Sequence, residues 1–281
     1  MTKANKIAFI GAGSMAEALI SGMTKSLYQS KQIIVTNRSN IDRLNYLRTT
    51  YHVHIEHDKR KAVEDADIVI LAMKPKDVIE GINSIKDAVK DNQLIISVLA
   101  GVSTDSLVSL LGKNIAIIRA MPNTSATIGK SATALSLGRF ANEAHLAVAK
   151  ALFETVGVVA VVAEDDLHAV TGLSGSGPAY IYYFVEAMEK AAHEVGLNQK
   201  VAKDLIIQTI IGAAEMLKSS PKHPSTLRKE VTSPGGTTEA GLKVLENYRY
   251  QEAIVACIKQ AAQRSTELGQ SLTDMLSIQK S

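Results

Sequence analysis

Hydrophobic residues in the first half of the chain form short runs, and stretches with helical spacing separate these runs. Each run is rich in Ile, Val and Leu and has the length of a single strand. The runs lie at residues 6–10, 32–36, 68–72, 94–98 and 115–119. Because apolar strands that alternate with helices are typical of βαβ units, this half is predicted to form a parallel sheet in an α/β domain.

The pattern changes after residue 163, where long helical stretches replace the short apolar runs. Helices are predicted over residues 177–197 and 201–217. We therefore expect an α/β domain at residues 1–163 and an all-helical domain at residues 164–281. The helix at 201–217 is apolar on more than one face, through Val201, Leu205, Ile206, Ile207, Ile210, Ile211, Ala213, Ala214 and Leu217. Either a partner subunit covers the extra face, or the helix is central in a bundle formed by one chain.

A glycine-rich segment directly follows the first apolar run. Residues 11–16 have the sequence GAGSMA and start a helix, so they match the dinucleotide-binding pattern G-x-G-x-x-A. Gly11 permits the tight turn, Gly13 lets the backbone approach a pyrophosphate, and the small Ala16 allows close packing of helix on strand. The cofactor contacts predicted in this segment are Ile10, Gly11, Ala12, Gly13, Ser14 and Met15.

The end of the second apolar run indicates which dinucleotide is preferred. An NAD-binding protein usually has an acidic residue there, on the ribose hydroxyls, but this chain has Asn37, Arg38 and Ser39. Because Arg38 can bind a ribose phosphate through charge-assisted hydrogen bonds, NADPH is predicted to be preferred, with NADH possible. Alternatively, Ser39 or Asn40 caps the next helix and Arg38 stays in solvent. Both interpretations can hold together.

Three further turns follow predicted strands, where ligands of parallel sheets collect. The first contains Ala72, Met73, Lys74 and Pro75, and the second contains Ala100 and Gly101. The third offers Asn123, whose amide is predicted to lie near the nicotinamide end of the cofactor. Pro75 and Gly101 could instead be plain turn formers.

The segment at residues 231–241, VTSPGGTTEAG, combines glycines and hydroxyl groups at the start of a helix. Its Pro and two Gly let the backbone approach a ligand closely, and the free amide groups of the helix favour negative charge. An ordinary helix cap would need only one Ser or Thr. The density of donors therefore favours an anion-binding turn that includes Ser233, Gly235, Gly236, Thr237 and Thr238.

Composition excludes several classes of partner. The 281 residues carry a net charge of only +3, contain no basic block and have few aromatic residues, so neither nucleic acid nor a membrane is an expected partner. No segment is long enough to span a bilayer. Cys257 is the single cysteine, so no internal disulfide is possible, and this favours a reducing compartment such as the cytoplasm. Because Cys257 lies in an apolar helical run, it is expected in the core. His52, His54 and His57 are expected to alternate along a strand, and no metal is expected.

Taken together, these residues resemble the pyrroline-5-carboxylate reductase family, which reduces a cyclic imine to L-proline with NADPH or NADH. The resemblance runs nearly from end to end and is carried by residues 9–16, 73–75, 121–124, 173–180 and 233–238. It implies an N-terminal Rossmann-type domain, an all-α C-terminal dimerisation domain and an active site shared between subunits. It also implies a homodimer, often within a decamer of five dimers.

The resemblance assigns roles to particular residues. The substrate carboxylate would bind backbone amides at residues 235–238, and Thr238 would act as the catalytic residue by hydrogen bonding to the ring nitrogen. The implied substrate contacts are Glu164, Ser233, Gly235, Gly236, Thr237 and Thr238. Because solvent can protonate a cyclic imine, no dedicated acid is needed.

Some residues depart from the family pattern, and two other functions remain open. Ser125 stands where Pro is common, His168 where an acid is common, and Lys59 where an Asn often approaches the adenosine. A β-hydroxyacid dehydrogenase would need a catalytic Lys where this chain has Pro178 and Tyr180. A non-catalytic nucleotide-binding regulator is the alternative from outside the enzymes.

Overall fold

The structure, a computed structural model, describes residues 6–278 and divides into two compact units. The first unit comprises Met1–Pro178 together with Lys259–Ser281, and the second comprises Ala179–Ile258. The first division between compact units thus falls after Pro178, whereas the change in sequence pattern falls after residue 163, and the C-terminal segment belongs to the first unit. The domain boundary between residues 163 and 164 stays a prediction.

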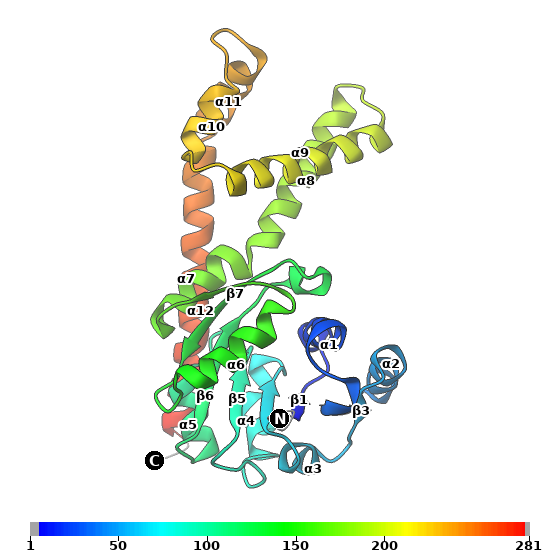
Figure 1. The fold of residues 1–281 in the computed structure, drawn as a ribbon. Coiled ribbons are helices and arrows are strands. Elements are labelled where there is room, and N and C mark those ends of the chain that lie inside the picture. The colour runs from blue at the N-terminus through cyan, green and yellow to red at the C-terminus, as the bar shows by residue number, and fades with distance from the viewer. Residues whose placement is uncertain (1–5, 279–281) are drawn as a thin grey trace. The chain divides into compact units, whose positions relative to one another are not determined.

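An eight-stranded sheet forms the centre of the first unit, with the order β3-β2-β1-β4-β5-β6-β7-β8 (Figure 1). The strands predicted from the sequence are present, with their ends moved by a few residues. They are β1 (Ile7–Ile10), β2 (Ile33–Thr36), β4 (Ile68–Leu71), β5 (Leu94–Ser97) and β6 (Ala116–Met121). The predicted α/β class is therefore confirmed.

β3 (His54–Ile55) falls within the short strand expected around the histidines. Two strands were not predicted, namely β7 (Ser131–Leu137) and β8 (Gly157–Val161). β7 runs antiparallel to β6, with Ala120 opposite Leu135, so the expectation of a purely parallel sheet is wrong at this edge. The reason is that a short connection, which includes the 3₁₀ turn Thr124–Ile128, links β6 to β7 without a crossover helix.

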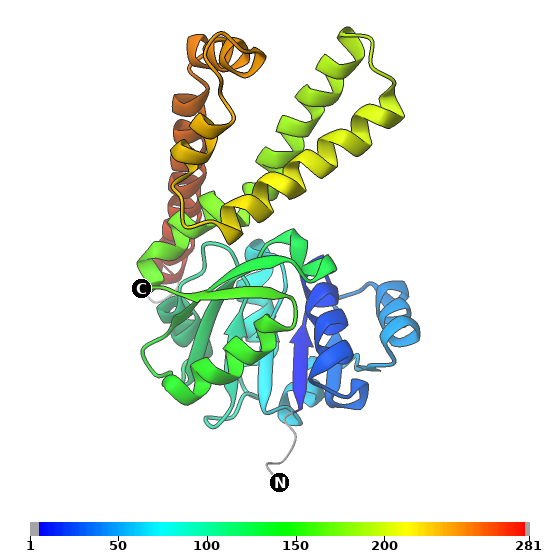
Figure 2. The same cartoon turned by 45° about the horizontal axis from the view of Figure 1, so that its top comes forward.

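Alternating side chains on the strands supply two apolar layers. Phe9 lies in one core cluster with Leu19 and Phe153, whereas Ile10 lies in the other with Leu71 and Leu107. Helices therefore cover both faces of the sheet, whose strands are seen side by side in Figure 2. The helices of this part are α1 (Ser14–Ser26), α2 (Ile41–Tyr51), α3 (Lys59–Glu64), α4 (Val78–Asn83), α5 (Thr104–Leu111) and α6 (Glu143–Glu154).

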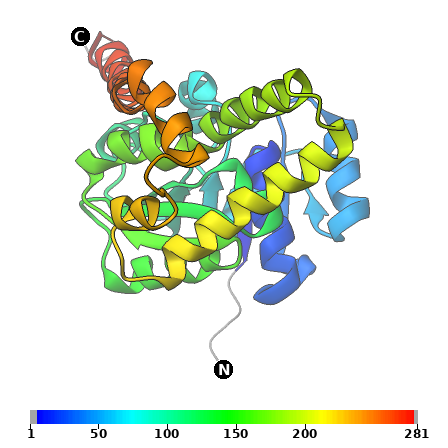
Figure 3. The ribbon, with the colours of Figure 1, turned by 90° about the horizontal axis from the view of Figure 1, so that it is seen from above.

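Helices make up the rest of the chain. They are α7 (Leu167–Val170), α8 (Gly177–Glu194), α9 (Gln199–Ser219), α10 (Pro224–Glu230), α11 (Thr237–Asn247) and α12 (Tyr250–Ile278), with a π turn at Thr171–Gly175 before α8. α8 and α9 form a hairpin (Figure 3), and they confirm the two predicted helices with shifted ends. Gly196 has a φ of +78° in the connection, and the Asn198 side chain accepts hydrogen bonds from the Lys200 and Val201 amides to start α9.

The second unit leaves much apolar surface exposed. In α9, only Ala202 and Ile206 are buried. Its exposed apolar residues are Val201, Leu205, Ile207, Ile211, Met216 and Leu217. Within the described chain the extra apolar face is therefore not covered, and this disfavours the alternative of a central helix in a single-chain bundle.

Two smaller expectations are wrong. Cys257 is exposed on α12, because an apolar helical run predicts the helix but does not say which of its faces is packed. The histidines do not alternate along one strand, since His52 ends α2 in the left-handed region and only His54 lies in β3. None of the helices in the described part of the chain is long and apolar enough to cross a membrane.

Candidate functional site

The site is built around the turn that follows β1. Gly11 has a φ of +117°, and a Cβ there would lie 2.6 Å from the Ala72 carbonyl oxygen and 2.8 Å from the Met73 nitrogen. Only glycine fits, because the backbone leaving β4 passes directly beside the turn. The Gly11 amide donates to the Thr36 carbonyl at 3.2 Å, so the turn is also tied to the end of β2. The carboxyl ends of three neighbouring strands thus meet at this point, as the glycine pattern predicts.

Helix α1 starts at the turn with its first amide groups available to a ligand. Its N-cap is Gly13, and no side chain caps it. A Cβ on Gly13 would lie 4.0 Å from the Ala72 carbonyl oxygen, so the space in front of the helix is open. The N-terminal end of this 13-residue helix has no side-chain cap, so its free amide groups and its dipole favour a bound anion. This geometry fits the pyrophosphate of a dinucleotide.

A cleft of about 720 Å³ lies in front of this turn. Three predicted segments line it together: Ile10, Gly11, Ala12, Gly13 and Ser14 from the first turn, Asn37, Arg38 and Ser39 from the second, and Ala72, Met73 and Lys74 from the third. Further residues that line it were not predicted, namely Glu17, Asn40, Arg43, Lys59, Lys76, Asp77, Glu80 and Gly81. Lys59 is the position where the family pattern has Asn, and it does face the cleft.

Arg38 lies in the cleft but has carboxylate neighbours. Its Nη1 is 3.1 Å from Glu80 Oε2 and 3.5 Å from Asp77 Oδ1. Ion pairs this exposed contribute less than about 1 kcal/mol, so a ribose phosphate can replace them. Asn40 is the cap of α2 and accepts from the Arg43 amide at 2.9 Å. Capping and cofactor binding are therefore compatible, as expected.

Five predicted cofactor contacts are not among the residues that line the cleft: Met15, Pro75, Ala100, Gly101 and Asn123. Gly101 packs against α12, since a Cβ on Gly101 would lie 3.3 Å from the Gly269 nitrogen. The Asn123 side chain accepts from the Ser125 amide at 3.1 Å and donates to the Ser174 carbonyl at 3.0 Å. A nicotinamide contact by Asn123 would have to share this amide group, and it stays a prediction.

Glu164 belongs to a polar cluster of the first unit that also contains Thr104 and Arg119. Its carboxylate accepts from the Thr104 amide at 2.8 Å and from the Thr104 hydroxyl at 2.5 Å, and it lies 3.2 Å from Arg119 Nη1. Burial lowers the pKa of Arg119, and the charge of Glu164 opposes that shift. The Arg119 side chain is only 1% exposed, and its Nε and Nη2 have no hydrogen-bond partner among the described atoms.

This cluster makes Glu164 an anchor between strand β6 and helix α5. Its predicted substrate contact is not tested by this geometry and stays a prediction. Arg119 was missed because the only signal in the sequence is one charged residue at the end of an apolar run.

Nearby, His168 Nδ1 lies 2.9 Å from the Ser265 hydroxyl. Burial, followed by the charge of Arg119, lowers the pKa of His168.

In the second unit, the predicted anion-binding turn precedes α11. Gly235 has a φ of +71°, and Gly236 is the N-cap of α11 without a side-chain cap. The Gly235 amide donates to Glu239 Oε2 at 2.6 Å, and this hydrogen bond lowers the pKa of Glu239. The turn thus already stabilises one carboxylate. Thr237 and Thr238 are exposed in the first turn of the helix, where they can meet a second anion.

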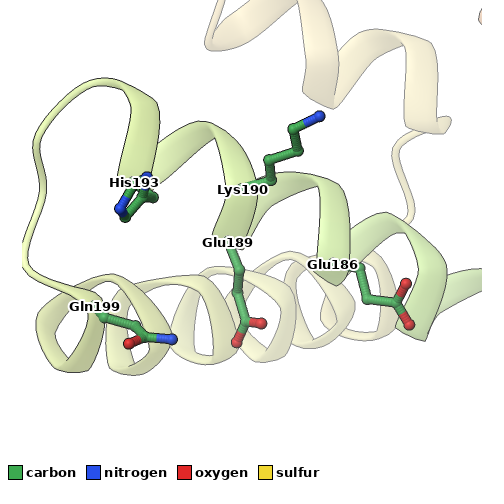
Figure 4. Close-up of a pocket in the computed structure, with 5 residues that line it drawn as sticks. All are labelled: Glu186, Glu189, Lys190, His193 and Gln199. Atoms are coloured by element: carbon green, nitrogen blue, oxygen red, sulfur yellow. The ribbon is translucent and has the colours of Figure 1, made fainter.

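Another hollow lies between α8 and α9 and is lined by Glu186, Glu189, Lys190, His193 and Gln199 (Figure 4). Lys190 points away from Glu189 and Gln199, so the charged groups do not converge on one point. Across the described residues, no group of three or more His, Cys, Asp or Glu side chains could hold a metal ion. The cleft of the first unit is therefore the better candidate site.

The doubly covered sheet, the glycine turn and the cleft define an NAD(P)-dependent oxidoreductase. Two family models match the chain: "Pyrroline-5-carboxylate reductase dimerisation" over residues 164–268, and "NADP oxidoreductase coenzyme F420-dependent" over residues 6–101. The chain is 52% identical to pyrroline-5-carboxylate reductase 2 of Bacillus subtilis (strain 168), across 94% of this chain and 95% of that protein.

Solved structures agree with this match. A pyrroline-5-carboxylate reductase from Coxiella burnetii has a TM-score of 0.87 at 37% identity, with 95% of this chain and 99% of that chain covered. The Plasmodium falciparum pyrroline carboxylate reductase, solved with NADP bound, has a TM-score of 0.87 at 26% identity, with 94% and 98% covered. The chain belongs to the pyrroline-5-carboxylate reductase family.

Proposed function

We propose that this protein reduces 1-pyrroline-5-carboxylate to L-proline, the last step of proline biosynthesis, with NAD(P)H. The observation that carries the proposal is the cleft, where the Gly11 turn and the uncapped start of α1 meet the ends of β2 and β4. The identity of 52% to a pyrroline-5-carboxylate reductase across 94% of the chain supports the cyclic imine as substrate.

The residues of the cleft fit a dinucleotide. Backbone amides from Ile10 to Met15 would hold the pyrophosphate, because Gly11 and Gly13 leave room for it. The segment with Asn37, Arg38 and Ser39 would hold the ribose phosphate, which favours NADPH over NADH. The turn at Ala72, Met73, Lys74 and Pro75 would continue towards the nicotinamide, with Ala100, Gly101 and Asn123. When bound, the cofactor supplies the hydride for the imine carbon.

The anion-binding turn of the second unit would hold the substrate. Backbone amides from Gly235 to Thr238, assisted by Ser233, suit the carboxylate, since the turn already favours negative charge at Glu239. The Thr238 hydroxyl would donate to the ring nitrogen as that atom gains electron density. Solvent protonates the imine, so orientation is the main task of the residues. Glu164 is also proposed to lie close to the substrate.

The protein is proposed to act as a homo-oligomer. Residues 164–268 match a dimerisation domain, and the apolar face of α9 is exposed in the described chain. A homodimer within a larger assembly such as a decamer is consistent with both observations. The single cysteine, Cys257, fits a reducing compartment such as the cytoplasm.

The proposal is tested by following NADPH oxidation by the purified protein with pyrroline-5-carboxylate. NADH and a panel of 2-oxo and 3-oxo acids are measured in parallel. Turnover with the imine alone is expected. Turnover of an oxo acid instead would indicate a dehydrogenase, and cofactor binding without any turnover would indicate a nucleotide-binding regulator.

A further inference from the structure

We propose that Arg43 is a positioning residue that shapes the glycine turn for the pyrophosphate by holding the carbonyl groups of Ala12 and Gly13. The inference rests on the proposed function only in that a dinucleotide occupies the cleft. Helix α2 carries Arg43, and α1 and α2 lie next to each other (Figure 1). Arg43 also lines the cleft.

The contacts of Arg43 converge on the turn. Its Nε donates to the Ala12 carbonyl oxygen at 2.8 Å, and its Nη2 lies 3.4 Å from the Gly13 carbonyl oxygen. Nη2 also pairs with Glu17 Oε2 at 2.5 Å. Three-quarters of the side chain is shielded from solvent, since 24% is exposed. The planar guanidinium thus bridges two successive carbonyl groups and a carboxylate, which a lysine cannot do with the same geometry.

Glu17 holds the guanidinium from the other side. Its Oε1 accepts from the Tyr46 hydroxyl at 3.1 Å and the Tyr51 hydroxyl at 3.0 Å. Burial raises the pKa of Glu17, but hydrogen bonds from Arg43, Tyr51 and Tyr46 outweigh burial, so the pKa lies below its ordinary value. The carboxylate therefore stays charged, and its anchoring fixes the orientation of Arg43.

These contacts matter because a turn that binds phosphate must present N–H groups and keep its carbonyl oxygens away from the anion. In this turn the Ala12 and Gly13 carbonyls belong to residues that line the cleft. The Gly13 oxygen already accepts from the Glu17 amide of α1 at 3.0 Å, so the Ala12 oxygen is the one that Arg43 chiefly holds and whose negative partial charge Arg43 offsets. Arg43 thus acts on the pyrophosphate through the turn. NADPH and NADH share this pyrophosphate, so Arg43 is expected to favour the binding of both to the same extent.

The test compares Arg43→Met and Arg43→Lys with the intact full-length protein. Dissociation constants for NADPH and NADH are measured by nucleotide fluorescence, without imine, together with the unfolding temperature. Arg48→Met is the matched control, because Arg48 lies on the same helix and its Nη2 donates to the local Asn45 side chain at 3.0 Å, away from the glycine turn. We expect Arg43→Met to raise the dissociation constants for NADPH and NADH by the same factor, about tenfold. Arg43→Lys is expected to recover part of the lost affinity. Arg48→Met is expected to change neither dissociation constant.

Two outcomes would overturn the inference. Loss of NADPH affinity alone would show that Arg43 contacts the ribose phosphate directly. A lower unfolding temperature with both dissociation constants unchanged would show a purely structural role. Binding is measured without imine, so the role of Arg43 can be decided even if the protein does not reduce the proposed imine substrate.

Discussion

Arg38 is the residue on which we propose that the cofactor preference depends, and in the structure it pairs with Glu80 and Asp77. Arg38→Ala is expected to raise the KM for NADPH several-fold and to leave the KM for NADH nearly unchanged, because only NADPH carries the ribose phosphate. Glu80→Gln is expected to lower the KM for NADPH, since one competing carboxylate is removed. Steady-state kinetics with both cofactors test this, with Arg139→Ala as a control. Equal changes for both cofactors would exclude the assignment of Arg38.

Thr238 is the proposed donor to the ring nitrogen. Thr238→Ala is expected to lose about 1.5 to 3 kcal/mol of transition-state stabilisation, roughly a ten- to hundredfold fall in kcat/KM. Thr238→Ser keeps the hydroxyl and is expected to recover most of the activity. The measurement is initial rates over a range of imine concentrations. An Ala variant as active as the parent would remove Thr238 from the mechanism.

At the scale of elements, Glu164 joins strand β6 to helix α5 through Arg119 and Thr104. Glu164→Gln leaves the buried Arg119 charge without its counter-charge, so a loss of about 3 kcal/mol in the free energy of unfolding is expected. Thermal unfolding at a fixed protein concentration tests this, with exposed Asp165→Asn as the control. If the unfolding temperature holds and only kcat/KM falls, Glu164 serves the substrate and not the fold.

The local pattern of hydrophobic residues predicted most helices and strands. It failed where pairing with other strands decides whether a segment forms a strand. The strand at Ile68–Leu71 is buried on both faces and was recognised from its apolar run. The strand at Ser131–Leu137 contains two Ser and a Thr in its seven residues, so its sequence resembles a polar connection. It is a strand because β6 and β8 pair with it on both sides. Pairing over such distances is not encoded in the period of one segment.

For the whole molecule, the exposed apolar face of α9 predicts assembly with a second copy. Leu205→Glu is expected to reduce the mass of the assembly, because burying a charged carboxylate in an interface is energetically unfavourable. The matched control is Gln208→Glu, which adds the same charge at an exposed position of the same helix. Light scattering after size exclusion measures the mass. An unchanged assembly for Leu205→Glu would place the interface elsewhere.

The sequence alone determined the features that depend on a few neighbouring residues. The G-x-G-x-x-A spacing at residues 11–16 predicted the turn and the helix that follows it, and the periods of the apolar runs predicted the α/β class. The same local density of glycines and hydroxyls marked the turn at residues 233–238, and the resemblance to the family followed from such motifs.

The tertiary structure alone decided which distant side chains meet. Arg43 reaches Ala12, Glu80 reaches Arg38, and Glu164 reaches Arg119 across separate elements. It also packs Gly101 against α12 and leaves Cys257 exposed. The physical reason is that helix and strand preferences act within a turn or two of chain. Contacts between elements depend instead on how the whole chain buries its apolar faces, and that sets the order of the strands and the neighbours of each loop.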